Sequence, residues 1–289
     1  MPQAGYSFVV QAEEKPCRAV SSRALCFGAV LALVIGLGMG LGFWRSLRAP
    51  AWHGRGTSAN FSQRVLKRCS SYSRGSVPEL GGKRCPEIVA AFENAFLSKD
   101  PCQITEEDYQ PLINLTQQSI PCGKFLFWSR SKKLAHRYTR QKKEFFTLED
   151  TLLGRLADGL TWCGEKGSPE MNYQSCPHWK EDCAKNPVLV FWVLASRRFA
   201  ENACGEVTVM LNGSQSNAFS RSSMFGSIEV RHLDPKKVHT LQAWVMQNPG
   251  GVSGDSCSGT TISDLKSIIN GRNITFICHD VNSLEEICV

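Results

Sequence analysis

The sequence predicts a mixed α+β to α/β fold: a mainly helical N-terminal part, then a smaller C-terminal part with a parallel sheet flanked by helices. Helical patterns dominate the middle of the chain, whereas strand-like and helix-like segments alternate after Cys204. Eleven of the thirteen cysteines lie after residue 44, so we expect disulfide bonds to stabilise both parts. We expect the functional site in a cleft between the two parts.

The N-terminal region contains an apolar segment, residues 24–44, that has no charged side chain. It is long enough to cross a bilayer as one helix and exceeds the apolar core of a cleavable signal peptide. The positive charges on its two sides are balanced and do not set an orientation. The acceptor sequences for N-glycosylation all follow the segment, at Asn60, Asn114, Asn212 and Asn273.

These features predict a single-pass type II protein of the plasma membrane. We expect a cytoplasmic tail over 1–23, a transmembrane helix over 24–44, a stalk over 45–62 and an extracellular folded domain over 63–289. Glycines four residues apart in the span, such as Gly36 and Gly40, would allow two spans to pack closely as a homodimer. The net charge of +7 favours anionic ligands, but outside the cell it does not indicate a nucleic-acid partner.

The extracellular domain begins with helical patterns. Its helical part is expected over about 63–120 and 145–203, and its α/β part over about 121–144 and 204–289. Apolar residues recur at helical spacing in Glu87–Leu97. A threonine precedes an aspartate by three residues at Thr105 and at Thr147, which predicts a capped helix start at each. The short apolar run Lys124–Ser129 suits a buried strand.

The C-terminal part alternates between strand and helix patterns. Strands are predicted over Val207–Leu211, Ser227–Leu233 and Asn273–Cys278. Helices are predicted over Lys237–Met246 and Ser263–Asn270. Strands separated by helices form parallel sheets, so we expect one here.

Several common catalytic motifs are missing from the sequence. It has no HExxH pair, no G-x-S-x-G elbow and no phosphate-binding P-loop, and the six histidines are scattered, so no metal site is expected. The basic run Arg130–Lys143 is interpreted as a solvated helix face. Tryptophans and the acids Glu149, Asp150, Asp158 and Glu229 remain as candidates. From spacing alone, each acid is more often a cap or an ion-pair partner than a catalytic group.

Five longer segments closely resemble the ADP-ribosyl cyclase family. They are Leu126–Arg130 (LFWSR), Phe146–Gly154 (FTLEDTLLG), Leu160–Gly164 (LTWCG), Asn186–Ala200 (NPVLVFWVLASRRFA) and Phe225–Val230 (FGSIEV). The resemblance runs from the N-terminal tail to about Cys278. It is strongest to the type II membrane form found on leukocyte surfaces, which agrees with the predicted span.

The resemblance implies an enzyme that cleaves the nicotinamide–ribose bond of NAD and yields ADP-ribose with some cyclic ADP-ribose. It also implies hydrolysis of cyclic ADP-ribose and exchange of the base of NADP to make NAADP. The expected partner is this dinucleotide substrate, with no metal and no bound cofactor. A surface adhesion partner is also implied, and a non-catalytic receptor on the same fold is the alternative. Such a receptor could have lost Glu229, Trp192 or Glu149, and this chain has kept all three.

The resemblance also assigns roles to individual residues. Glu229, two residues into the predicted strand, matches the carboxylate that stabilises or traps the ribosyl cation. Trp128 and Trp192 match the aromatic walls of the pocket, and Glu149 matches the position that biases hydrolysis against cyclisation. The other matches are Glu149 and Asp158 for the nicotinamide carboxamide, Ser196 near the reacting ribose, and Ser129, Arg130 and Phe225 for the diphosphate.

The cysteine pairing is likewise implied by the resemblance. The expected disulfides are Cys69–Cys85, Cys102–Cys183, Cys122–Cys204, Cys163–Cys176 and Cys257–Cys278. Cys288 matches the first half of a further family disulfide, whose partner position lies beyond Val289.

Overall fold

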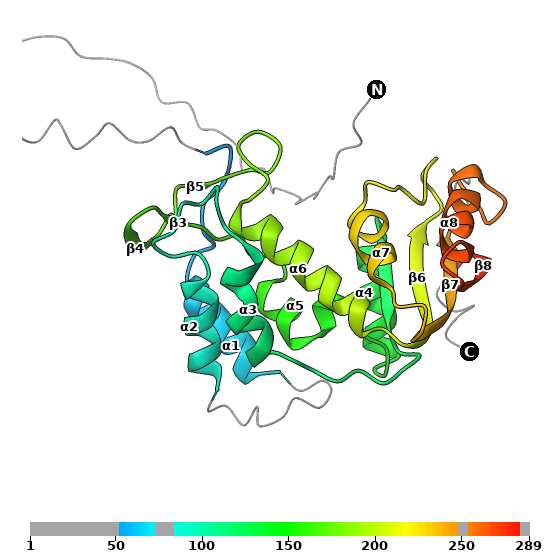
Figure 1. Cartoon of the computed structure of the whole chain (residues 1–289), viewed down its shortest axis with the longest axis horizontal. Coiled ribbons are helices and arrows are strands. Elements are labelled where there is room, and N and C mark those ends of the chain that lie inside the picture. Colours follow the sequence, from blue (N-terminus) through cyan, green and yellow to red (C-terminus); the bar gives the residue numbers. More distant parts are fainter. Residues whose placement is uncertain (1–51, 73–83, 248–253, 284–289) are drawn as a thin grey trace, which may run out of the picture. The chain divides into compact units, whose positions relative to one another are not determined.

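A four-stranded parallel sheet organises the C-terminal part of the chain (Figure 1). The computed structural model describes residues 52–72, 84–247 and 254–283. The strands, in spatial order, are β2 (Leu126–Ser129), β6 (Gly205–Asn212), β7 (Val238–Met246) and β8 (Thr275–Val281). Every neighbouring pair is parallel, so the carboxyl ends of all four strands meet at one edge. The parallel sheet predicted from the sequence is confirmed.

The two faces of the sheet belong to two different apolar clusters. On β6, Val209 and Leu211 join the main core, whereas Met210 between them points to a smaller cluster. This alternation is what the period of two along a strand requires. The smaller cluster is closed by α4 (Lys132–Gln141), whose Tyr138 ring lies 5.2 Å from that of Trp244 on β7.

Two elements predicted for the C-terminal part are wrong. Lys237–Met246, predicted as a helix, is strand β7 between β6 and β8. Its apolar residues happen to recur at helical spacing, but the continuous apolar run Ala243–Met246 is buried on both faces, as in the middle of a parallel sheet. Ser227–Leu233, predicted as a strand, lies instead in a π-helical turn, η3 (Phe225–Glu229), and a short helix, α7 (Val230–His232). The helix predicted at Ser263–Asn270 is confirmed as α8 (Thr260–Asn270), and the last predicted strand as β8.

The helical part is built around an aromatic core. Its helices are α1 (Phe61–Ser70), α2 (Cys85–Asn94), α3 (Glu106–Leu115), α5 (Leu152–Ala157) and α6 (Pro187–Asn202). Phe92 of α2 stacks on Phe191 of α6 with ring centroids 5.4 Å apart, and the indole of Trp162 meets both rings edge-on. The long helix α6 packs against α3 and also against η3 and α7, so it joins the aromatic core to the α/β part.

Both predicted capping boxes are present. Thr105 caps α3 with Asp108, and Thr147 caps a 3-10 turn, η2 (Leu148–Asp150), with Asp150. The chain then turns sharply into α5, where a Cβ on Gly154 would lie 2.1 Å from the Leu148 carbonyl oxygen. Only glycine fits that contact, and the tight turn fixes the position of η2.

The last residues of the predicted stalk belong to the fold. β1 (Gly54–Arg55) pairs antiparallel with β5 (Ser175–Cys176), and the side chains of Thr57 and Phe61 are buried. A small hairpin, β3 (Gly164–Glu165) with β4 (Ser168–Met171), lies in the same half of the chain. The predicted tail and span, residues 1–44, lie outside the described residues. Among the helices that the structure does describe, none has the length and apolar character needed to cross a bilayer.

All five expected disulfides are present. They join Cys69 to Cys85, Cys102 to Cys183, Cys122 to Cys204, Cys163 to Cys176, and Cys257 to Cys278. The second and third close loops of 81 and 82 residues, and each contributes about 4.5 kcal/mol in a chain-entropy account. Cys288 lies outside the described residues.

Candidate active site

Several of the predicted site residues lie at or just after the carboxyl ends of the strands. β2 ends at Ser129, whose side chain is buried, and Arg130 follows in a left-handed backbone conformation with φ of 58°. The segment after β6 runs from residue 213 to the π-helical turn η3. Ligands of open α/β sheets bind at this edge, so the topology itself favours a site here.

Glu229 is the last residue of η3 and is buried, with 7% of its surface exposed. The turn that carries it depends on Gly226, because a Cβ there would lie 2.3 Å from the Ser220 carbonyl oxygen. Ser223 Oγ accepts a hydrogen bond of 3.0 Å from the Gly226 amide, which holds the start of the turn. Wide π-type turns are rare and are frequently found at functional sites.

Ser196 provides the hydrogen bond that Glu229 receives. It lies on α6, is almost fully buried, and its hydroxyl donates to the Glu229 carboxylate. Burial raises the pKa of Glu229 to about 8, the Ser196 hydrogen bond lowers it, and the charge of Glu149 raises it. The fold therefore brings two carboxylates close enough to repel each other.

Glu149 lies on η2, and its side chain is 7% exposed. The indole Nε1 of Trp128, on β2, donates a hydrogen bond of 3.1 Å to Glu149 Oε2. The ammonium of Lys132 lies 4.0 Å from Oε1 and 5.9 Å from the centre of the Trp128 ring. Trp128, predicted as a wall of the pocket, and Glu149, predicted to bind the carboxamide, are thus joined by a hydrogen bond.

Lys132 also binds Asp158, the residue that follows α5 as its C-cap, through an ion pair of 2.5 Å between Nζ and Oδ1. Sequence reasoning missed this lysine, because the basic run Arg130–Lys143 was interpreted as solvent-facing. Placing the run on a helix would have separated a face toward Glu149 from a face toward solvent. Lys132 and His136 are one turn apart on the side toward Glu149, whereas Lys133 and Arg137 are exposed.

Arg130 is fixed by the segment after β6. Its Nη1 donates hydrogen bonds of 2.6 Å to Asn217 Oδ1 and 3.2 Å to the Asn217 carbonyl oxygen. Asn212, at the end of β6, donates 3.2 Å to the Arg130 carbonyl oxygen through Nδ2. A guanidinium held in this way beside strand ends is suited to an anion such as a diphosphate.

The other predicted residues differ in exposure. Trp192 lies one turn before Ser196 on α6, is half-buried, and meets Phe191 edge-on at 5.2 Å. The ring of Phe225 is buried beside Phe127 at 5.9 Å, so only its backbone is available to a ligand. The roles in substrate binding that the resemblance implied for both residues stay predictions.

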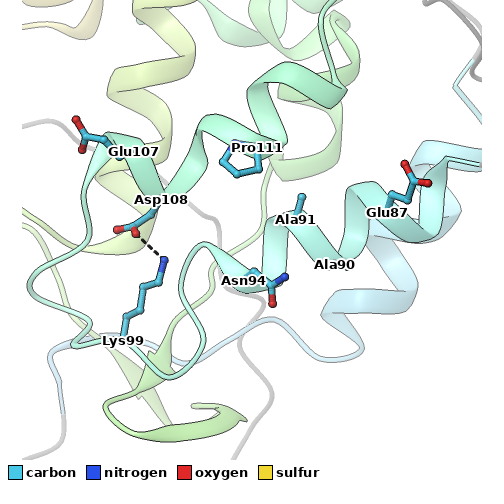
Figure 2. A pocket seen from close by; sticks show the side chains of 8 residues that line it. All are labelled: Glu87, Ala90, Ala91, Asn94, Lys99, Glu107, Asp108 and Pro111. Atoms are coloured by element: carbon cyan, nitrogen blue, oxygen red, sulfur yellow. Dashed lines mark hydrogen bonds and ion pairs between the residues drawn. The ribbon is translucent and has the colours of Figure 1, made fainter.

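A separate hollow of about 550 Å³ lies between α2 and α3 (Figure 2). An ion pair between Lys99 and Asp108 crosses one side of it. It shares no residue with the group around Glu229 and Glu149. The buried carboxylates and the indoles identify the site on chemical grounds, and this hollow has neither.

Comparison with known proteins identifies the family of the chain. Residues 58–289 match the ADP-ribosyl cyclase family. The chain is similar to ADP-ribosyl cyclase/cyclic ADP-ribose hydrolase 1 of Oryctolagus cuniculus, with 49% identity over 95% of this chain and 91% of that protein. The same-named protein of Rattus norvegicus is 53% identical over 81% of this chain and 77% of that protein. The fold is similar to porcine CD38 with a covalent intermediate, ribo-F-ribose-5'-phosphate, with a TM-score of 0.75, 52% identity, and coverage of 79% of this chain and 99% of that chain.

Proposed function

Because this chain belongs to the ADP-ribosyl cyclase family, we propose that it cleaves the nicotinamide–ribose bond of NAD. The ADP-ribosyl group then passes to water, giving ADP-ribose, or to its own adenine ring, giving cyclic ADP-ribose. The enzyme also hydrolyses cyclic ADP-ribose. The observation that carries the proposal is the buried Glu229 carboxylate, held by Ser196 and close to Glu149. The covalent intermediate of the porcine relative supports it.

The chemistry fits a single carboxylate of this kind. Nicotinamide leaves as a neutral ring, so its departure needs no proton donor, while positive charge develops on the ribose. The Glu229 carboxylate stabilises that charge or bonds to the anomeric carbon. The cationic pyridinium of bound NAD opposes the burial effect and favours the ionised form of Glu229.

The remaining residues orient the substrate at an opening between the helical part and the α/β part. Trp128 and Trp192 stack on the pyridinium, which an indole face attracts. Glu149 and Asp158 bind the carboxamide, and Arg130 and Ser129 receive the diphosphate. With NADP and nicotinic acid, the same intermediate is captured by the incoming base to give NAADP. The reaction uses no metal and no bound cofactor, because the leaving group needs neither a Lewis acid nor an electron carrier.

The proposal includes a place for the enzyme: the plasma membrane, with the catalytic domain outside as a type II protein and a surface adhesion partner. Support comes from the apolar segment 24–44, the glycosylation sequences after it, and five disulfides. Of the acceptor asparagines, Asn60 and Asn114 are exposed, as is Asn273. Antibodies against the folded domain should bind intact cells as completely as permeabilised cells; binding that needs permeabilisation would contradict this orientation.

The activity is tested with the full-length chain in membranes, incubated with NAD and analysed by chromatography. The parent should release nicotinamide and ADP-ribose with some cyclic ADP-ribose. Glu229→Gln keeps the shape of the side chain but removes its charge, so kcat should fall about 10³-fold. Arg231→Ala, an exposed position on α7 outside the proposed machinery, serves as the control. A folded parent without turnover would leave a non-catalytic receptor as the function.

A further inference from the structure

His136 has a buried polar atom with no hydrogen-bond partner in the described part of the chain. The atom is Nε2, and it points toward Glu149 from one turn beyond Lys132 on α4. Leaving a buried donor or acceptor unpaired costs about 1–3 kcal/mol. Unpaired buried polar atoms are few in native structures, so each one needs a structural or functional explanation.

The geometry around Glu149 explains the unpaired nitrogen of His136. Its Oε2 accepts a hydrogen bond from Trp128 Nε1, and His136 Nε2 lies 3.6 Å from the same oxygen. That separation suits an ion pair only if the imidazole is charged, and it is too long for a hydrogen bond. A movement of about 0.6 Å would form one. A carboxylate accepts about four hydrogen bonds, so Oε2 has room for both donors.

The packing of α4 keeps the His136 ring on the side of the helix that faces Glu149. Its neighbours Ala135 and Tyr138 anchor α4 on the sheet through the smaller apolar cluster. Lys132 is already engaged with Asp158 at 2.5 Å and reaches Glu149 only at 4.0 Å. His136 is therefore the group on α4 that lies nearest to Glu149 without a closer partner of its own.

We propose that His136 is a positioning residue for Glu149: when substrate fills the site, its Nε2–H donates to Glu149 Oε2 and fixes the carboxylate against the carboxamide. The inference rests on the proposed function, since it takes from there the role of Glu149 in directing the intermediate to water or to adenine. A loosely held Glu149 changes how the substrate folds and how water enters. His136 does not act on the departing nicotinamide, so its loss changes the product ratio more than the rate of cleavage.

The test compares products formed from NAD by the full-length chain in membranes. His136→Phe keeps a ring of similar size but cannot donate, and it should change the ratio of cyclic to linear ADP-ribose about threefold or more, with kcat within about twofold. His136→Gln, whose amide can donate to the same oxygen, should restore the parental ratio. Arg137→Ala, the exposed neighbour on the same helix, is the matched control and should leave it unchanged.

A double-variant cycle separates positioning from a general structural effect. In a Glu149→Ala background, His136→Phe should change the product ratio no further, because the group that it positions is gone. A parental ratio in His136→Phe, or an equal shift in His136→Phe and His136→Gln, would overturn the inference while nicotinamide release continues. Failure of the parent to release nicotinamide would instead overturn the proposed function.

Discussion

Two buried ionisable groups, Tyr109 in the aromatic core and Glu229 at the edge of the sheet, differ in how their surroundings treat the charged form. The Tyr109 hydroxyl donates to the Pro187 carbonyl oxygen and accepts from Trp162 Nε1, both at 2.9 Å. Burial raises the pKa of Tyr109 well above its usual range, so it is neutral whenever the protein is folded. Glu229 is also buried, but it has a single hydroxyl donor, Ser196, and a second carboxylate nearby.

The difference separates a group that stabilises the fold from one that the fold tolerates. Every hydrogen-bonding capacity of Tyr109 is used, and it carries no charge. Glu229 is held where its charged form is disfavoured, and a strained ground state of this kind is typical of catalytic groups. Substitutions at the two positions should therefore change stability in opposite directions.

The largest stability effect is expected at Glu229. Folding raises its pKa above the usual value of 4.5 to about 8, so its burial costs nothing below pH 4.5 and progressively more as the pH rises to 8. Glu229→Gln should therefore stabilise the protein by about 3 kcal/mol at pH 7 and by almost nothing at pH 4. Thermal unfolding at the two pH values measures this. An equal shift at both would show that charge is not the cause.

The opposite sign is expected at Tyr109. Tyr109→Phe leaves Trp162 Nε1 and the Pro187 carbonyl oxygen without their partner, and it should destabilise the protein by about 2 kcal/mol. NAD cleavage below the melting temperature should be unchanged. Loss of activity in the folded variant would mean that the aromatic core and the site are not separable. Denaturant unfolding and nicotinamide release give the two readouts.

The smallest effect concerns pH and activity. With a pKa of about 8, Glu229 is mostly protonated at pH 7, so kcat/KM for NAD should rise about tenfold between pH 7 and pH 9. Ser196→Ala removes the hydrogen bond that lowers this pKa, and the rise should move to higher pH. A profile that is flat across this range in both proteins would show that Glu229 of the free enzyme does not titrate between pH 7 and pH 9.

Much of the framework could be predicted from the sequence. The strand at Lys124–Ser129 and both capping boxes depend on local patterns, and the structure has them as β2 and at Thr105 and Thr147. The disulfide pairing followed from family resemblance and not from spacing. For those features, local propensity and tertiary structure agree.

The segment around Glu229 could not be predicted in the same way. Ser227–Leu233 has the β-branched, alternating character of a strand, but the contact between Gly226 and Ser220 and the serine hydroxyls that bond the backbone make it a wide turn. The contacts among Trp128, Lys132 and Glu149 were not predicted for another reason. These residues come from a strand, a helix and a 3-10 turn, and only the packing of α4 beside β2 brings them together.

The disulfide between Cys122 and Cys204 also constrains how the chain is made. The two cysteines are 82 residues apart, and each lies just before one of the strands β2 and β6, which pair in the sheet. At about 5–20 residues per second, Cys122 waits roughly 4–16 s for its partner to be synthesised. Cys102 emerges before it and waits for Cys183 over a similar interval. During that time the two early cysteines can pair only with wrong partners, such as each other, Cys69, Cys85, Cys163 or Cys176. The yield of native enzyme therefore depends on how well the oxidising compartment reshuffles bonds that formed too soon.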